Sequence, residues 1–136
     1  MKHSSLFYVR FLIAALFMLS ATCVFAQQAE NQFASLSVEE FSEYVKSRKV
    51  IIVDVRTEKE YAEGHLEKAV NVVWNDQFDN NVEQAKLKKR KTLAVYCRSG
   101  RRSKSAAKVL VAKGYNVVEL NGGIIAWIQA GKKTEK

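Results

Sequence analysis

A run of six residues, Val50-Ile51-Ile52-Val53-Asp54-Val55, limits most strongly what this chain can fold into. All but Asp54 are apolar and β-branched, and no polar residue alternates with them. This pattern is typical of a strand that is buried on both faces. Strands of that kind occur in parallel sheets that are covered by helices on both sides, so the run predicts an α/β fold.

Strands and helices are predicted to alternate along the rest of the chain. The first helix is expected after Ser37, because Ser37 and Glu40 have the spacing of a capping box. Three further strands are predicted over residues 71–74, 92–96 and 117–120, and further helices over 58–64, 78–85, 103–113 and 124–130. The alternation predicts a small parallel sheet flanked by helices, with its ligand site beyond the carboxyl ends of the strands.

The first 26 residues are typical of a secretory signal peptide. Basic residues precede an apolar run at 11–19, and small residues permit cleavage after Ala26. The run is short for a permanent membrane anchor, so we expect export, most simply to a bacterial periplasm. Cys23 offers an alternative in which the chain is lipidated and attached to a membrane, although Thr22 fits the lipidation motif poorly.

Cleavage would leave a chain long enough for one domain. We expect residues 27–35 to form a lead-in segment, residues 36–131 to form the folded domain, and residues 132–136 to form a basic C-terminal tail.

The charge and the cysteines narrow the choice of function. The formal net charge of +8 favours anionic partners, and export argues against nucleic acid. Loss of the signal would leave Cys97 as the only cysteine and His65 as the only histidine, so we expect no metal site and no cofactor. An unpaired cysteine in an exported protein indicates intermolecular pairing or a reactive thiol. The sequence specifies no oligomeric state.

Cys97 follows a predicted strand and precedes a predicted helix. The unpaired N–H groups and the dipole at a helix N-terminus favour a thiolate there, and Gly100 lets the loop amides turn inward around an anion. Arg98, Arg101 and Arg102 add positive potential, although at least one of them is expected to be only a surface charge. These features should hold the thiol pKa below about 8.5 and make Cys97 a nucleophile. The alternative is a small core residue.

Several segments of the chain resemble the rhodanese family and occur in the family's order. They are Asp54-Val55-Arg56, Glu60-Tyr61, Gly64-His65-Leu66, Ala69-Val70-Asn71, the loop from Cys97 to Ser103, Gly114-Tyr115, Leu120-Asn121-Gly122-Gly123 and Trp127. The resemblance covers residues 36–131. The chain departs from the family in one place, because no proline follows Asn71-Val72.

The resemblance implies a sulfurtransferase in which the Cys97 thiolate takes the outer sulfur of thiosulfate or a similar anionic donor. The resulting persulfide would pass its sulfur to cyanide or a thiol. The resemblance also implies that the loop residues hold the persulfide and the donor; they are Arg98, Ser99, Gly100, Arg101 and Arg102. Two alternatives are a non-catalytic module that binds an anion or a partner, and a persulfide carrier for a dedicated protein.

Three other residues are expected to support the site. Asp54 can hold the neighbouring loop, and Arg56 can pair with Glu60. Ser103 stands where phosphatases and arsenate reductases of related folds carry an arginine, which favours sulfur transfer over phosphate chemistry. His65 is expected to support the fold rather than to form a dyad with Cys97.

Overall fold

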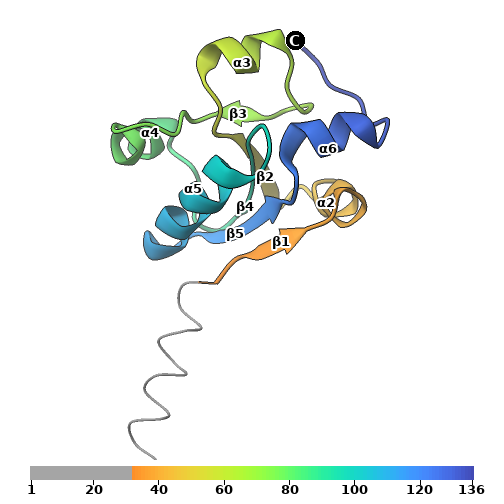
Figure 1. Cartoon of the computed structure of the whole chain (residues 1–136). Helices are drawn as coiled ribbons and strands as arrows, with labels where there is room; N and C mark the ends of the chain where they lie inside the picture. The colour runs from red at the N-terminus through yellow and green to blue at the C-terminus, as the bar shows by residue number, and fades with distance from the viewer. Residues whose placement is uncertain (1–31) are drawn as a thin grey trace, which may run out of the picture. The chain divides into compact units, whose positions relative to one another are not determined.

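The computed structural model describes residues 32–136 of the chain (Figure 1). The predictions of a signal peptide, of cleavage after Ala26 and of lipidation at Cys23 lie outside these residues. None of the helices within residues 32–136 is both long enough and apolar enough to cross a membrane.

The centre of the fold is a five-stranded sheet in the order β1-β5-β4-β2-β3, with every neighbouring pair parallel (Figure 1). Its strands are β1 (Ala34–Leu36), β2 (Val50–Asp54), β3 (Val70–Asn71), β4 (Thr92–Tyr96) and β5 (Asn116–Leu120). Its helices are α2 (Val38–Tyr44), α3 (Glu58–Glu63), α4 (Phe78–Ala85), α5 (Arg101–Ala112) and α6 (Gly123–Gln129). The α/β prediction is therefore confirmed.

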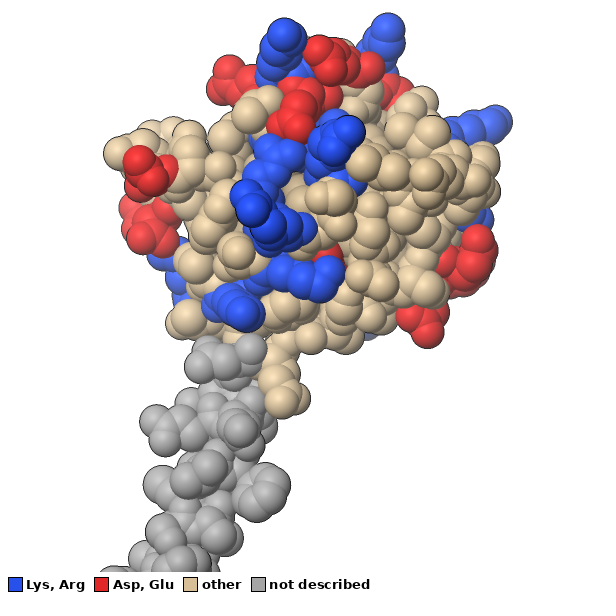
Figure 2. All heavy atoms as spheres, viewed as in Figure 1, with Lys and Arg blue, Asp and Glu red and all other residues tan. Residues whose placement is uncertain are grey.

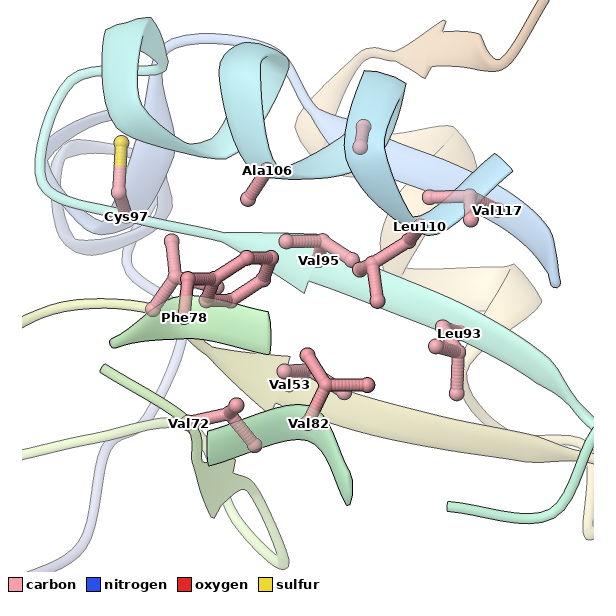
Figure 3. Close-up of a cluster of buried hydrophobic side chains, with 12 residues drawn as sticks. Val53, Val72, Phe78, Val82, Leu93, Val95, Cys97, Ala106, Leu110 and Val117 are labelled. Atoms are coloured by element: carbon pink, nitrogen blue, oxygen red, sulfur yellow. The ribbon is translucent and has the colours of Figure 1, made fainter. Parts of the chain in front are cut away.

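Apolar side chains cover both faces of the sheet, because successive residues of a strand point to opposite sides. On one face, Val53 and Val95 pack with Leu110 of α5, and Cys97 lies at one end of this cluster (Figure 3). On the other face, Phe41 of α2 and Trp127 of α6 belong to a second cluster. Cys97 therefore reaches the sheet edge on the α5 side.

Two segments that were predicted without regular structure take part in the fold. β1 begins in the predicted lead-in at Ala34, ends at Leu36, the first residue of the predicted domain, and pairs with β5, from Ala34 opposite Val118 to Leu36 opposite Leu120. In the predicted tail, the N–H of Glu135 donates to the carbonyl of His65 at 2.8 Å, and the reverse bond is also 2.8 Å. Both pairings join residues far apart in the sequence, so local patterns did not reveal them.

Some element boundaries also differ from the predictions. The strand predicted at 71–74 is observed at Val70–Asn71, although the N–H groups of Val72 and Trp74 still bond the carbonyls of Asp54 and Val55 at 2.9 and 3.0 Å. α5 begins at Arg101 rather than at residue 103, which leaves a very short loop between β4 and the helix.

Candidate active site

Cys97 lies directly after β4, in the short loop that ends where α5 begins. The loop turns sharply because Gly100 has a φ of 109°, a left-handed conformation that favours glycine. The N–H of Gly100 donates to Cys97 Sγ at 3.1 Å. No side chain caps α5, and the N–H that bonds the sulfur belongs to Gly100, the residue immediately before the helix.

Hydrogen bonds to the sulfur stabilise its anionic form. Burial raises the pKa of the Cys97 thiol, since only 1% of the residue is exposed. Hydrogen bonds from the hydroxyl of Ser103 and from backbone amides of Ser103, Gly100 and Ser99 lower this pKa, and together they outweigh burial. The pKa therefore lies below its usual value. The separation between Cys97 Sγ and Ser103 Oγ is 3.4 Å. A thiol in this setting is a competent nucleophile.

A buried carboxylate behind the loop holds Ser103 in place. Glu119 on β5 is completely buried, and its Oε1 lies 2.8 Å from Ser103 Oγ, so this carboxylate and the Cys97 thiolate compete for the one proton of that hydroxyl. The same carboxylate accepts the hydroxyl of Ser35 on β1 at 2.6 Å and lies 3.4 Å from Lys104 Nζ. These partners compensate the buried charge. Glu119 was not predicted as part of the site, and its only signal was one acidic residue within an apolar strand.

The start of α6 fixes the backbone of the loop. The N–H of Ile124 donates to the carbonyl of Cys97 at 2.9 Å, and the N–H of Ile125 donates to that of Arg98 at 3.2 Å. This contact requires glycine at position 123, because a Cβ there would lie 2.4 Å from the carbonyl oxygen of Arg98. The two glycines after β5 thus allow α6 to approach the loop.

The three loop arginines differ in their surroundings. Arg98 and Arg101 are exposed, as is Ser99 between them. Arg102 is half-buried and binds the carboxylate of Glu60 on α3 through two hydrogen bonds, both 2.8 Å long. Hydrogen bonding to Arg102 holds the pKa of Glu60 at about 2. Arg102 is thus tied to α3, whereas no ion pair within residues 32–136 includes Arg98 or Arg101.

Asp54 and Arg56 form a separate buried network beside the loop. The carboxylate of Asp54 accepts bonds from the hydroxyl of Tyr96 at 2.6 Å and from the guanidinium of Arg56 at 2.7 Å. Arg56 also donates to the carbonyl of Gly64 at 2.6 Å. The prediction that Arg56 pairs with Glu60 is wrong, because the buried carboxylate of Asp54 is nearer and Glu60 binds Arg102 instead. The network supports the chain next to the site.

His65 is occupied elsewhere in the fold. Its Nδ1 lies 3.0 Å from the carbonyl of Tyr61, its ring stacks on that of Tyr61 at 3.8 Å, and its Nε2 lies 3.5 Å from Glu135. Within residues 32–136, no three histidine, cysteine or acidic side chains are grouped so that they could hold a metal ion. The chemistry available at the site is therefore that of a thiolate at a helix N-terminus, lined by amides and flanked by arginines.

Comparisons with known proteins agree with this geometry. A family model described as a rhodanese-like domain matches residues 37–130. A sulfurtransferase of Allochromatium vinosum is 36% identical over 83 residues, which are 60% of this chain and 75% of that protein. A tRNA uridine(34) hydroxylase of Hamiltonella defensa is 32% identical over 104 residues, which are 74% of this chain. The match spans only 29% of that hydroxylase.

Solved structures share the fold. A rhodanese-related protein from Thermoplasma volcanium superposes with a TM-score of 0.68 and 27% identity, over 76% of this chain and 98% of that one. A thiosulfate sulfurtransferase from Pseudomonas aeruginosa gives a TM-score of 0.66 and 26% identity, over 79% of this chain and 21% of that one.

Proposed function

Because the chain belongs to the rhodanese-like domain family, we propose that it is a sulfurtransferase that carries sulfane sulfur as a persulfide on Cys97. The observation that carries the proposal is the position of Cys97 Sγ, which accepts the N–H of Gly100 at 3.1 Å at the start of α5 and has a lowered pKa. The donor is thiosulfate or a similar sulfane compound, and the acceptor is cyanide or a thiol.

The first half of the reaction loads the cysteine. The Cys97 thiolate attacks the outer sulfur of thiosulfate, the sulfur–sulfur bond of the donor breaks, and its electron pair leaves with sulfite. The new persulfide is an anion beside the amides of Ser99 and Gly100, which stabilise it. Exposed Arg98 and Arg101 attract and orient the anionic donor.

The second half unloads the cysteine. A nucleophilic acceptor attacks the outer sulfur, the persulfide bond breaks, and Cys97 leaves as a thiolate. The hydrogen bonds that lower the pKa of the Cys97 thiol also make it a better leaving group, so the same contacts assist both halves.

The loop contents favour sulfur over phosphate as the transferred group. Ser103 Oγ lies 3.4 Å from Cys97 Sγ, so a hydroxyl rather than a cation stands beside the sulfur at this position. Arg102, the arginine before it, binds Glu60 instead of facing the loop interior. A tetrahedral phosphate would need an inward-facing arginine to bind its oxygens.

Intact-mass measurement tests the proposal directly. Incubation with thiosulfate should add the mass of one sulfur atom, cyanide should remove it, and Cys97→Ser should show no gain. A wild-type protein that gains no sulfur would overturn the proposal and leave the non-catalytic module as the better interpretation. Appreciable turnover of an aryl phosphate would contradict the choice of sulfur over phosphate.

We also propose that the protein is exported, on the strength of the basic start, the apolar run at 11–19 and the small residues before Gln27. The mass of the protein recovered from its host tests this. Cleavage after Ala26 gives the soluble form, a lipid on Cys23 gives the membrane-attached form, and an intact N-terminus contradicts export.

A further inference from the structure

We propose that four basic side chains, Arg98, Arg101, Lys104 and Lys108, dock an acidic protein segment that brings a cysteine thiol to Cys97. We call these four residues the α5 strip. This inference rests on the proposed function, because it identifies the acceptor of the persulfide sulfur as a thiol carried by an acidic partner.

The α5 strip is a continuous surface that begins at the active-site loop. Arg101, Lys104 and Lys108 are three and four residues apart, so they lie on one face of α5. Arg98 precedes them in the loop. Arg98, Arg101 and Lys108 are exposed, and 42% of the Lys104 side chain is exposed. Figure 2 shows basic side chains gathered over the loop and along α5, with acidic side chains mostly at the margins of this face.

The charges of the α5 strip are largely unpaired. Among the ion pairs within residues 32–136, none includes Arg98, Arg101 or Lys108. Lys104 is the exception, because its Nζ lies 3.4 Å from the buried carboxylate of Glu119 and 3.4 Å from Asn121 Oδ1. Some basic side chains elsewhere have exposed acidic partners, such as Lys46 with Glu43 and Lys113 with Asp79, whereas others, such as Lys88 and Arg90 before β4, have no ion pair among the described residues either. What distinguishes the α5 strip is that its unpaired charges begin beside Cys97. The α5 strip therefore keeps its charge available to another molecule.

Helix stability does not account for these charges. The first turn of α5 contains no acidic residue, although the helix dipole favours acidic side chains there. Cations at this end are unfavourable unless an anion binds. A small oxyanion at the loop needs only the nearest arginines, whereas Lys108 lies about 10 Å along the helix axis from Arg101. That length matches about three residues of an extended chain.

The position of the α5 strip identifies the kind of partner. Its loop end adjoins Cys97, so a docked chain delivers its own reactive group to the persulfide. The group must be a nucleophile for sulfane sulfur, and in proteins that group is a cysteine thiolate. A nucleic acid also carries negative charge, but its phosphodiester backbone supplies no such nucleophile. An acidic segment with a cysteine therefore satisfies both the charge and the chemistry.

Two short peptides of equal length provide the test. Each contains one cysteine, flanked by Asp and Glu in the first and by Ser and Gly in the second. Sulfur transfer from thiosulfate-loaded protein should be about tenfold faster to the acidic peptide at low ionic strength. The advantage should disappear when salt rises to about 0.5 M.

Matched variants separate the α5 strip from overall charge. Arg101→Glu/Lys108→Glu should remove the preference for the acidic peptide, and the charge-preserving pair Arg101→Lys/Lys108→Arg should retain it. Lys88→Glu/Arg90→Glu makes the same change in net charge in the loop before β4, at the opposite end of that strand from Cys97. This control should retain the preference. Equal transfer to both peptides, or equal loss in the control, overturns the proposal.

A binding measurement needs no sulfur chemistry. Cys97→Ser protein should bind the acidic peptide, with serine in place of its cysteine, more tightly than it binds the neutral one. If thiosulfate fails to load the wild type while this binding persists, the sulfurtransferase proposal fails and the α5 strip remains a docking surface. If loading succeeds but the peptides bind equally, docking fails alone. Stronger competition by a single-stranded RNA of equal charge would also overturn the proposal.

Discussion

Helices α2 and α3 begin very differently from α5. Ser37 and Glu40 form a reciprocal capping box at α2, and Thr57 and Glu60 form another at α3. Both helices carry acidic residues in the first turn. α5 has glycine at its cap, no capping side chain and arginines in its first turn.

The residues at the starts of α2 and α3 stabilise these helices, whereas those at the start of α5 are suited to binding an anion. Capping boxes and acidic first turns satisfy the free N–H groups and complement the dipole of α2 and α3. At α5 the sulfur of Cys97 accepts a loop N–H, and the cations leave the dipole available for a negative ligand. The two kinds of start are joined by Glu60, whose carboxylate accepts the N–H of Thr57 in the capping box of α3 and also binds Arg102 of α5.

The largest expected effect comes from disrupting the contact between α6 and the loop that precedes α5. Gly123→Ala should destabilise the fold by about 3 kcal/mol, because the new Cβ would collide with the loop carbonyl of Arg98 and φ at this residue is 61°. Gly131→Ala is the control, since φ there is 75° but no atom lies within 4 Å of the added Cβ. It should cost about 1 kcal/mol in urea unfolding. Equal losses would show that the close approach at the loop is unimportant.

The next largest effect is expected from removing the ion pair between Glu60 of α3 and Arg102 of α5. Glu60→Gln should cost about 1–2 kcal/mol of unfolding free energy at pH 7, after allowance for partial exposure. The Glu60 pKa is lowered from 4.5 to about 2, so its stabilisation is present above 4.5 and is lost as pH falls towards 2. Unfolding of both proteins at several pH values should show the difference shrinking below pH 4.5. Exposed Glu63→Gln is the control, and a loss independent of pH would contradict the assignment.

A smaller effect concerns the donors around the sulfur. Ser103→Ala removes a hydrogen bond that lowers the pKa of the Cys97 thiol, so this pKa should rise. The rate of alkylation at pH 7 should fall about fivefold, and its pH profile should move to higher pH. Ser105→Ala, an exposed hydroxyl on the same helix, should leave the profile in place. An unchanged profile in Ser103→Ala would show that the amides alone stabilise the thiolate.

The smallest expected effect comes from placing an acidic residue in the first turn of α5, as in α2. Arg101→Asp should stabilise the fold by about 0.5 kcal/mol, because an acidic residue suits the helix N-terminus. The same change should slow loading by thiosulfate, since it reverses a charge beside the donor site. Glu39→Lys in α2 makes the reverse change at a helix start remote from Cys97, and should lose similar stability without affecting loading. A variant at position 101 that loads faster would contradict the comparison.

Local sequence patterns predicted much of this architecture. The capping box of α2, the buried run of β2 and the strand–loop–helix context of Cys97 all depend on residues close together in the chain. A short window of sequence therefore contains all the residues needed to predict each of these features. The start of α5 was harder to predict, because its N-cap is a glycine with no capping side chain.

The features that escaped prediction depend on distant residues. β1 is three residues long and exists through its pairing with β5. The Arg102–Glu60 pair joins residues 42 positions apart. The buried carboxylate of Glu119 has its partners on distant elements, because Ser35, Ser103 and Lys104 converge on it from β1 and α5. No short window of sequence contains these partners, so each required the folded structure.

The attachment of the loop to α6 has a consequence for how such a site can diversify. The bonds from Ile124 and Ile125 grip main-chain carbonyls, which every amino acid possesses, while the side chains at 98, 99 and 101 point into solvent. The main-chain atoms of these residues thus fix the conformation of the loop, and their side chains are the atoms that can contact a ligand. Substitutions at those three positions can therefore change which ligand the site binds, while the main-chain bonds to α6 keep the conformation of the loop unchanged.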